Sequence, residues 1–294
     1  MNSRYGRGLV VGKFCPLHLG HEWLITQAQA SCDRLIVLSY TVPGFPGYEA
    51  ARRERWLLTR FPEIQVVVID QQRLSELCAA REIGDVPCLP ADAAHDDEHR
   101  QFVAWLCLHL LQTTVDVVFS SEDYGDGFAK VLSRHFGHTV DHVCVDKQRS
   151  NAPVSGTVIR SNPWAYRHYL SPEVYASFVR RIAILGGESS GKTTLTEALA
   201  ERMGAHWVPE YGRERWEAQS GRLAFEDMLH IAQTQVFREA TFALHANKWL
   251  VCDTTPLTTL FYCDSIFHRA PQELEHLAER RYDLTIICAP DFPF

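Results

Sequence analysis

One segment of this 294-residue chain limits the possible folds more than any other. The eight residues from Gly186 to Thr193 read GGESSGKT, which fits the pattern G-x-x-x-x-G-K-[ST]. An apolar stretch at 181–185 precedes them, and a helical pattern at 191–203 follows. In a strand–loop–helix unit of this kind, backbone N–H groups and the helix N-terminus face a phosphate. The sequence therefore predicts a P-loop within an α/β unit.

The side chains of this loop have different expected roles. Lys192 can reach the β- and γ-phosphates of ATP, and the Thr193 hydroxyl can hold Mg²⁺. Asp253 ends a second apolar stretch, at 249–252, where an acidic residue supports Mg²⁺ or accepts a proton from a substrate hydroxyl. The loop alone leaves open a kinase, an ATPase or a GTPase. The other expected phosphate-binding residues are Gly186, Gly187, Glu188, Ser189, Ser190, Gly191 and Thr194.

A second phosphate motif lies near the N-terminus, where residues 12–21 read GKFCPLHLGH. His18 and His21 are three residues apart at the start of an expected helix, so both imidazoles can face one side. Two imidazoles beside helix N–H groups form a phosphate site, and Gly20 permits close approach of a nucleotide. A zinc pair, a covalent histidine nucleophile and two surface histidines without a role are weaker alternatives. The phosphate site also includes Gly12 and Phe14.

Two further segments relate to this motif. Residues 135–138 read HFGH, but no strand with the longer pattern precedes them, so we expect a helix-to-strand turn without a catalytic role. Ser155, Thr157 and Arg160 stand at the opening of another helix, where two hydroxyls and a bidentate guanidinium can hold phosphate oxygens. Alone, this segment would also fit a helix N-cap followed by a surface arginine.

Short β-branched stretches alternate with longer amphipathic stretches along the chain. Such alternation predicts parallel sheets covered by helices on both faces. The expected strands lie at 8–12, 35–40, 66–69, 115–119, 140–145, 181–185, 249–252 and 284–288. The expected helices lie at 19–31, 49–60, 97–112 and 191–203, with partly helical structure at 160–181. We therefore expect two doubly wound α/β domains, a Rossmann-like domain at 1–172 and a P-loop domain at 178–294.

Composition excludes several classes of protein. There is no run of about 18 apolar residues, and the N-terminal residues lack the apolar region of a signal peptide. Nine cysteines without paired spacing are typical of reduced thiols, which predicts a cytoplasmic protein. The net charge of −7 argues against a broad nucleic-acid surface. We expect small-molecule partners, with neither nucleic acid nor membrane; the oligomeric state is left open.

The segments at 12–21 and 155–160 together resemble the HxGH nucleotidylyltransferases, whose signatures are GxFxPxHxGH and S-x-T-x-x-R. With the P-loop and the segments at 119–125, 208–213 and 253–259, the chain resembles the bifunctional NadR-type family nearly from end to end. This resemblance implies two activities with Mg²⁺ as the cofactor. One is adenylyl transfer from ATP to nicotinamide mononucleotide, giving NAD and pyrophosphate. The other is ATP-dependent phosphorylation of nicotinamide riboside, giving the mononucleotide.

The same resemblance implies a riboside site formed by Glu210, Tyr211 and Arg213, although an ion pair between Glu210 and Arg213 is an equally open reading. Phe294 falls where the family has an aromatic residue that stacks on the nicotinamide. The chain departs from the family at both ends. The first strand starts too early for a preceding helix-turn-helix repressor domain, and the chain stops before the expected lid segment.

The early stop leaves a truncated sequence or a weak kinase as expectations, because a kinase without its lid excludes water poorly. Two alternative functions follow from these observations. One is a nucleotidylyltransferase that uses another mononucleotide, such as nicotinic acid mononucleotide; a phosphopantetheine substrate fits poorly with the fused P-loop. The other is a nucleotide-sensing regulator in which the P-loop domain is inactive.

Overall fold

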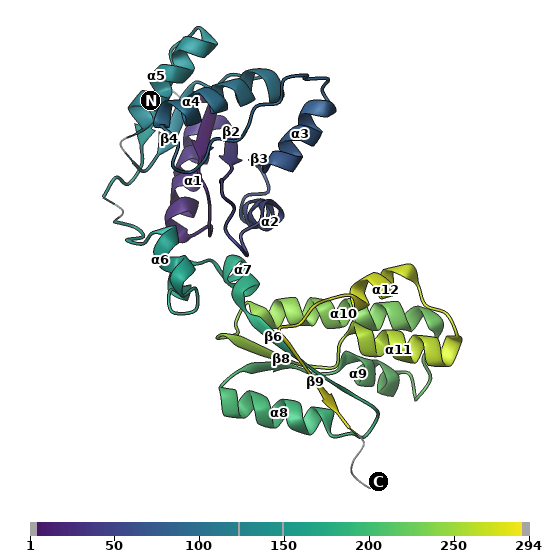
Figure 1. Cartoon of the computed structure of the whole chain (residues 1–294). Helices are drawn as coiled ribbons and strands as arrows, with labels where there is room; N and C mark the ends of the chain where they lie inside the picture. Colours follow the sequence, from purple (N-terminus) through teal and green to yellow (C-terminus); the bar gives the residue numbers. More distant parts are fainter. Residues whose placement is uncertain (1–4, 123, 149, 290–294) are drawn as a thin grey trace. The chain divides into compact units, whose positions relative to one another are not determined.

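The computed structural model describes residues 5–122, 124–148 and 150–289 (Figure 1). The chain divides into two compact units, Met1–Val174 and Tyr175–Phe294, and each contains one parallel sheet. Both units have the α/β architecture that the sequence predicts. They are described separately below.

The sheet of the first unit has five strands in the order β3-β2-β1-β4-β5, and all pairs are parallel. The strand order therefore reverses beside β1, which places a crevice at the carboxyl ends of β1 and β4. The strands are β1 (Tyr5–Val11), β2 (Cys32–Ser39), β3 (Gln65–Val68), β4 (Val117–Ser120) and β5 (Asp141–Cys144).

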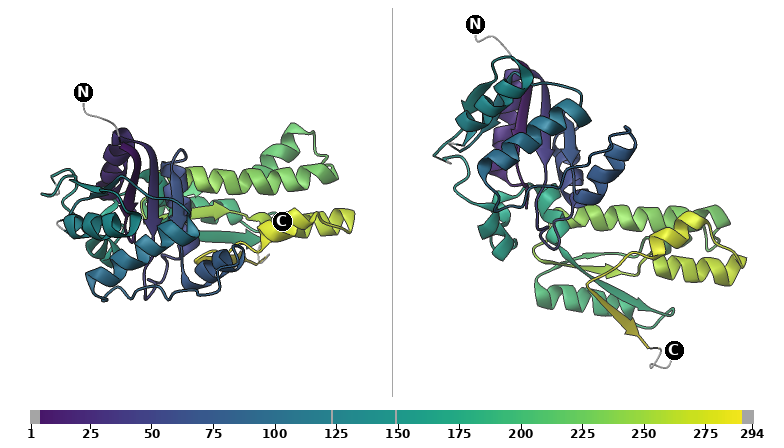
Figure 2. Two further views of the ribbon diagram at one scale, coloured as in Figure 1. Left: turned by 90° about the horizontal axis from the view of Figure 1, so that it is seen from above. Right: turned by 45° about the horizontal axis from the view of Figure 1, so that its top comes forward.

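Helices cover both faces of this sheet (Figure 2). Leu9, Ile36 and Val118 face a core that α3, α4 and α5 complete, whereas α1 contacts β1 and β2 on the side to which alternate residues such as Val10 point. The helices are α1 (Leu19–Ser31), α2 (Ala50–Arg60), α3 (Gln71–Ala79), α4 (Asp96–Trp105), α5 (Gly125–Phe136), α6 (Gly156–Ser161) and α7 (Pro172–Tyr175). Shorter helical segments of this unit are the π-helical η1 (Leu106–Leu110) and the 3₁₀ segment η2 (Arg167–Tyr169), whereas the 3₁₀ segment η3 (Ala176–Phe178) belongs to the second unit.

The sheet of the second unit has four parallel strands in the order β7-β8-β6-β9. Ile182, Ile184 and Val251 form a core with α8, and α10 contacts β7 and β8. The strands are β6 (Arg180–Gly186), β7 (His206–Val208), β8 (Trp249–Asp253) and β9 (Leu284–Cys288). The helices are α8 (Lys192–Met203), α9 (Tyr211–Ala218), α10 (Phe225–Ala243), α11 (Pro256–Phe267) and α12 (Gln272–Ala278).

A buried carboxylate ties α10 to the segment before β9. Glu239 is fully buried, and its two oxygens accept hydrogen bonds from Arg280 Nε at 3.1 Å and from the Tyr282 hydroxyl at 2.7 Å. Burial raises the pKa of Glu239, although the charge of Arg280 and the Tyr282 hydrogen bond oppose the shift. Because a buried charge is costly unless it is paired, these contacts fix the position of β9 beside β6.

Candidate functional site

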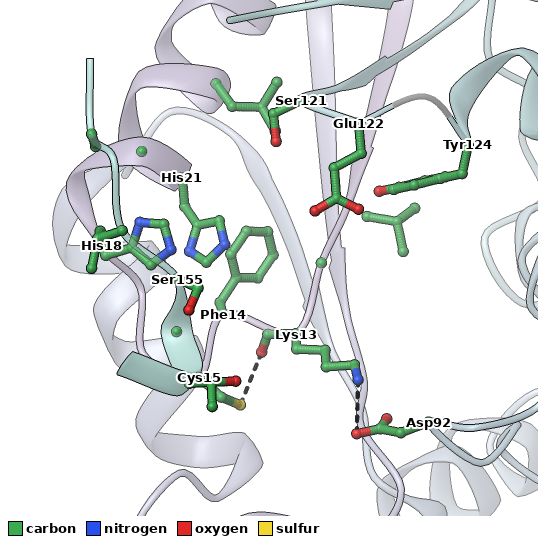
Figure 3. Close-up of a pocket in the computed structure, with 18 of the residues that line it drawn as sticks. Lys13, Phe14, Cys15, His18, His21, Asp92, Ser121, Glu122, Tyr124 and Ser155 are labelled. Carbon is green, nitrogen blue, oxygen red and sulfur yellow. Dashed lines mark hydrogen bonds and ion pairs between the residues drawn. The ribbon is translucent and has the colours of Figure 1, made fainter. Parts of the chain in front are cut away.

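The first unit contains a cavity of about 560 Å³ at the carboxyl ends of β1 and β4 (Figure 3). The segment between β1 and α1, the loops after β4 and β5, and the start of α6 line it. The structure brings together here all the residues that the sequence predicts for the first phosphate site. They are Gly12, Phe14, His18, Gly20, His21, Ser155, Thr157 and Arg160.

The two histidines of the first motif stand against each other at the N-terminus of α1. The rings of His18 and His21 are stacked, with centroids 3.6 Å apart and planes at 23°, and Phe14 packs edge-on against His21 (Figure 3). His18 is the N-cap of this 13-residue helix, so both imidazoles lie at the end where the backbone N–H groups have no acceptor within the helix. Gly20 leaves room for the His18 ring, because a Cβ at this position would lie only 3.1 Å from it. Donors grouped at a helix N-terminus bind anions such as phosphate.

Arg160 joins the two signature segments across the cavity. Its Nη1 donates to the Cys15 carbonyl at 2.6 Å, and its Nη2 donates to Thr157 Oγ1 at 2.9 Å. The guanidinium also lies 4.1 Å from the centre of the Phe45 ring. An arginine held in this way presents a fixed positive charge to the space beside the histidines.

Two other residues of this segment, Ser155 and Gly156, lie in the turn that begins α6. The Ser155 hydroxyl accepts a hydrogen bond from the Val158 N–H at 3.3 Å, so Ser155 is the N-cap of α6. Gly156 lies so close to the first motif that a Cβ would stand 2.8 Å from the Cys15 carbonyl oxygen. The N-cap reading of the sequence is therefore correct for Ser155. The arginine of this segment, in contrast, contacts the loop of the first motif.

Lys13 and Asp92 form an ion pair in the cavity that the sequence analysis did not select (Figure 3). Lys13 Nζ lies 2.9 Å from Asp92 Oδ2, and Asp92 also accepts hydrogen bonds from Thr41 Oγ1 and the Val42 N–H. Burial pushes the pKa of Asp92 upward, but these donors outweigh it and leave the pKa lowered. Lys13 could have been noticed from its place inside the first motif. Asp92 lies in a connection that carries no local signal.

Ser120, His142 and Asp126 form a hydrogen-bonded trio behind the loop that follows β4. His142 Nε2 lies 2.8 Å from Ser120 Oγ, and His142 Nδ1 lies 2.7 Å from Asp126 Oδ1. Although this order of groups resembles a nucleophile–base–acid triad, Ser120 is only 1% exposed and donates its proton to the Glu122 carbonyl at 2.8 Å. The trio supports the cavity wall that carries Ser121 and Glu122.

The second HxGH sequence, at residues 135–138, is a helix end. Helix α5 stops at Phe136, and Gly137 adopts a left-handed conformation, with φ of 74°, as its C-cap. The His138 ring lies 3.1 Å from the Val115 carbonyl and does not line the cavity. The predicted helix-to-strand turn is thus confirmed, and a four-letter motif alone does not identify the site.

The backbone of the P-loop in the second unit has positive φ values at several positions. Gly186, Ser189 and Gly191 have φ values of 151°, 57° and 81°, and α8 begins directly after them. The Lys192 side chain is buried and donates to the Gly187 carbonyl at 2.7 Å. This arrangement curls the loop around the helix N-terminus, where the helix dipole favours an anion.

The remaining residues of the loop differ in exposure. Ser190 is buried and donates to the Gly187 carbonyl at 2.8 Å. Glu188 is exposed in the loop, and Thr194 is exposed in the first turn of α8. The Ser190 bond stabilises the turn, whereas the exposed pair leaves the helix entrance open to solvent.

Thr193 and Asp253 stand next to each other at the carboxyl ends of β6 and β8. The Thr193 hydroxyl donates to Asp253 Oδ2 at 2.6 Å, and Asp253 is 1% exposed. Burial raises the pKa of Asp253, while the Thr193 hydrogen bond and the charge of Lys192 oppose the shift. A hydroxyl and a carboxylate beside a phosphate loop are the oxygen ligands that Mg²⁺ takes from proteins. Among the described residues, no cluster of three or more His, Cys, Asp or Glu could hold a metal alone.

The residues expected at the riboside site lie next to these groups. Arg213 Nη2 is 3.6 Å from Glu210 Oε2, and the Tyr211 hydroxyl is 3.1 Å from His230 Nε2. Burial, and then the nearby charge of Asp253, raise the pKa of Glu210. The ion pair between Glu210 and Arg213 is therefore present, and the Glu210 carboxylate also lies within reach of the charge of Asp253.

Tyr262 is a further neighbour that the sequence analysis missed. Burial, and then the charges of Glu210 and Glu188, raise its pKa, so α11 brings this ring to the same region. Phe294 lies outside the described residues. None of the helices in the described part of the chain combines the length and apolar character needed to cross a membrane.

Comparisons with known proteins cover nearly the whole chain, including both of these sites. A family model for an AAA domain matches residues 181–294. The chain is 31% identical over 312 residues to the trifunctional NAD biosynthesis/regulator protein NadR of Escherichia coli (strain K12), which covers 98% of this chain and 70% of the relative. The Salmonella typhimurium protein of the same name is 31% identical over 304 residues, with the same coverage.

Two solved structures share the fold. A NadR protein in complex with NAD and AMP-PNP has a TM-score of 0.63 at 22% identity, covering 98% of this chain and 82% of that chain. A NadR protein in complex with NR has a TM-score of 0.62 at 21% identity, covering 97% and 78%. With more than two thirds of each curated relative matched at 31% identity, this chain belongs to the NadR family.

Proposed function

We propose that this chain is an enzyme of NAD biosynthesis with one reaction in each unit. The first unit transfers the adenylyl group of ATP to nicotinamide mononucleotide and releases pyrophosphate. The second unit phosphorylates nicotinamide riboside with ATP. The names of the relatives support the first part of this proposal, since both are NAD biosynthesis proteins. The observation that carries it is the stacked histidine pair at the start of α1, joined through Arg160 to the second signature segment.

In the first unit, the phosphate of the mononucleotide attacks the α-phosphorus of ATP, so the protein need only align the reactants and stabilise charge. His18 and His21 hold the α- and β-phosphates as negative charge develops. Ser155, Thr157 and Arg160 hold the leaving pyrophosphate. Mg²⁺, when bound, neutralises part of the phosphate charge.

In the second unit, the ribose 5′-hydroxyl attacks the γ-phosphorus of ATP. Asp253 orients this hydroxyl or accepts its proton; in support, its carboxylate lies beside the P-loop, where it accepts a hydrogen bond from Thr193 at 2.6 Å. Lys192 holds the phosphates, while Thr193 and Asp253 hold Mg²⁺ when it is bound. Glu210, Tyr211 and Arg213 contact the riboside, and the carboxylate of Glu210 suits a cationic pyridinium ring.

Product analysis tests both assignments. Purified protein with Mg-ATP is given nicotinamide mononucleotide, nicotinic acid mononucleotide or nicotinamide riboside separately, and the products are identified by mass. NAD from the first and mononucleotide from the third support the proposal. If only nicotinic acid mononucleotide gives a product, that mononucleotide is the substrate of the first unit. Tight binding of ATP or NAD without any product indicates a nucleotide-sensing regulator and contradicts the enzyme assignment.

A further inference from the structure

Arg53, on α2, is among the largest fully buried side chains of the protein, with 2% of its surface exposed. A guanidinium remains charged in proteins, and its burial is unfavourable unless other groups compensate. Among the residues that the structure describes, no carboxylate lies within ion-pair distance of Arg53. Packing alone would be served equally well by an uncharged side chain, so the buried charge requires another explanation.

The contacts of Arg53 point to the first motif. Its Nη1 donates to the Lys13 carbonyl at 3.2 Å and to Ser39 Oγ at 2.5 Å. The Ser39 hydroxyl donates to the same Lys13 carbonyl at 3.1 Å, and Cys15 Sγ donates to it at 3.2 Å. Three donors therefore converge on one backbone oxygen, and two of them come from elements outside the motif.

The Lys13 carbonyl lies at a bend of the loop. Phe14 follows it with a φ of 50°, a left-handed conformation that a bulky residue keeps only when its surroundings hold it. The Phe14 ring packs edge-on against His21, with centroids 5.1 Å apart. A physical chain of contacts thus runs from Arg53 through the Lys13 carbonyl and Phe14 to the histidine pair.

We propose that Arg53 is a positioning residue of the adenylyl-transfer site, which holds the Lys13 carbonyl and thereby the bend that sets the histidine pair. Arg53 touches no substrate in this account; it acts through His21. The inference rests on the proposed function of the first unit. It adds a residue from α2, about 40 positions from the motif, to the site's machinery.

The test compares Arg53→Met, which keeps much of the volume but removes the donors, with Arg53→Lys, which keeps the positive charge and one donor nitrogen. Because a displacement of about 1 Å at a reacting group costs roughly 100-fold in rate, kcat of Arg53→Met should fall about 10- to 100-fold with KM for the mononucleotide nearly unchanged. Arg53→Lys should recover part of this loss. Arg52→Met is the matched control, since Arg52, the neighbour of Arg53 on α2, donates to the Gly47 carbonyl outside the cavity.

A double-mutant cycle separates positioning from general destabilisation. If Arg53 acts through His21, then Arg53→Met should cost little further in a His21→Ala background. Fully additive losses, or an equal loss in Arg52→Met, would overturn the proposal.

A readout without catalysis distinguishes this inference from the proposed function. In ¹⁵N-histidine NMR spectra, Arg53→Met should shift the ring signals of His18 and His21, and Arg53→Lys should shift them less, while Arg52→Met leaves them in place. Unchanged ring signals in a folded Arg53→Met protein contradict the positioning role, whatever reaction the site performs. Wild-type protein that makes no NAD contradicts the proposed function instead.

Discussion

His21 lies at the centre of the first site, stacked on His18 and in contact with Phe14. Since its charge interactions should strengthen as the α-phosphorus is attacked, His21→Ala should lower kcat for adenylyl transfer by 10²- to 10³-fold, or about 3–4 kcal/mol. Pyrophosphate release from Mg-ATP and nicotinamide mononucleotide measures the loss.

The chain provides its own matched control for this substitution. His138 ends the second HxGH sequence, directly after the C-cap of α5 and outside the cavity, so His138→Ala should leave the rate within about 2-fold. Equal losses in the two variants would show that the first motif has no special role.

At the residue scale, the sequence pointed to the residues that the structure groups at the two proposed phosphate sites, because each motif occupies a short, continuous stretch between a strand and a helix. Lys13 is part of the first motif and could have been selected from the sequence. Asp92, Arg53 and Tyr262 could not be found in this way, since they reach the sites from connections or helices far along the chain. Only the folded topology makes them neighbours.

At the scale of elements, a buried carboxylate, that of Asp227, stabilises the first turn of α10. Asp227 accepts a hydrogen bond from the Ala224 N–H at 2.8 Å and another from Arg215 Nη2 at 2.7 Å. First the backbone N–H and then Arg215 lower the pKa of Asp227. A carboxyl whose pKa is lowered by folding adds stability above its ordinary pKa, and this contribution is lost as the pH falls through the lowered value.

Asp227→Asn should therefore destabilise the second unit by about 1–2 kcal/mol at neutral pH, and the difference from wild type should shrink in acid. Thermal or urea unfolding across this range measures it. Glu226→Gln, at an exposed position in the same helical turn, is the control and should change stability by less than about 0.5 kcal/mol. A difference that stays constant down to the acid limit would contradict the role of the ionised carboxylate.

The elements themselves were predicted unevenly. The strands beside the two motifs are short apolar stretches, and the sequence predicted their bounds within a few residues. Strand β1 starts earlier than expected, at Tyr5, because polar residues such as Arg7 also pair with β2. Strand β7 and helices α3 and α9 to α12 were not predicted, and only the end of α5 was. Tertiary packing stabilises these elements: Met228, Cys263 and Leu274 are buried where α10, α11 and α12 meet, and their local pattern is mixed.

At the scale of the whole molecule, the two sites are built from separate units with separate sheets. Lys192→Ala removes the buried ammonium of the P-loop and should reduce riboside phosphorylation by about 100-fold or more, while adenylyl transfer is retained. His21→Ala should have the opposite effect, so that each variant serves as the control of the other. Loss of both activities in either variant would show that the two units do not act independently.

The most direct test supplies nicotinamide riboside and Mg-ATP to the intact chain and follows the products over time by mass. The account predicts that wild-type protein forms NAD, that His21→Ala accumulates nicotinamide mononucleotide, and that Lys192→Ala leaves the riboside unchanged but still makes NAD from added mononucleotide. Riboside that stays unphosphorylated with wild-type protein, or NAD that still forms at the wild-type rate with His21→Ala, would contradict it.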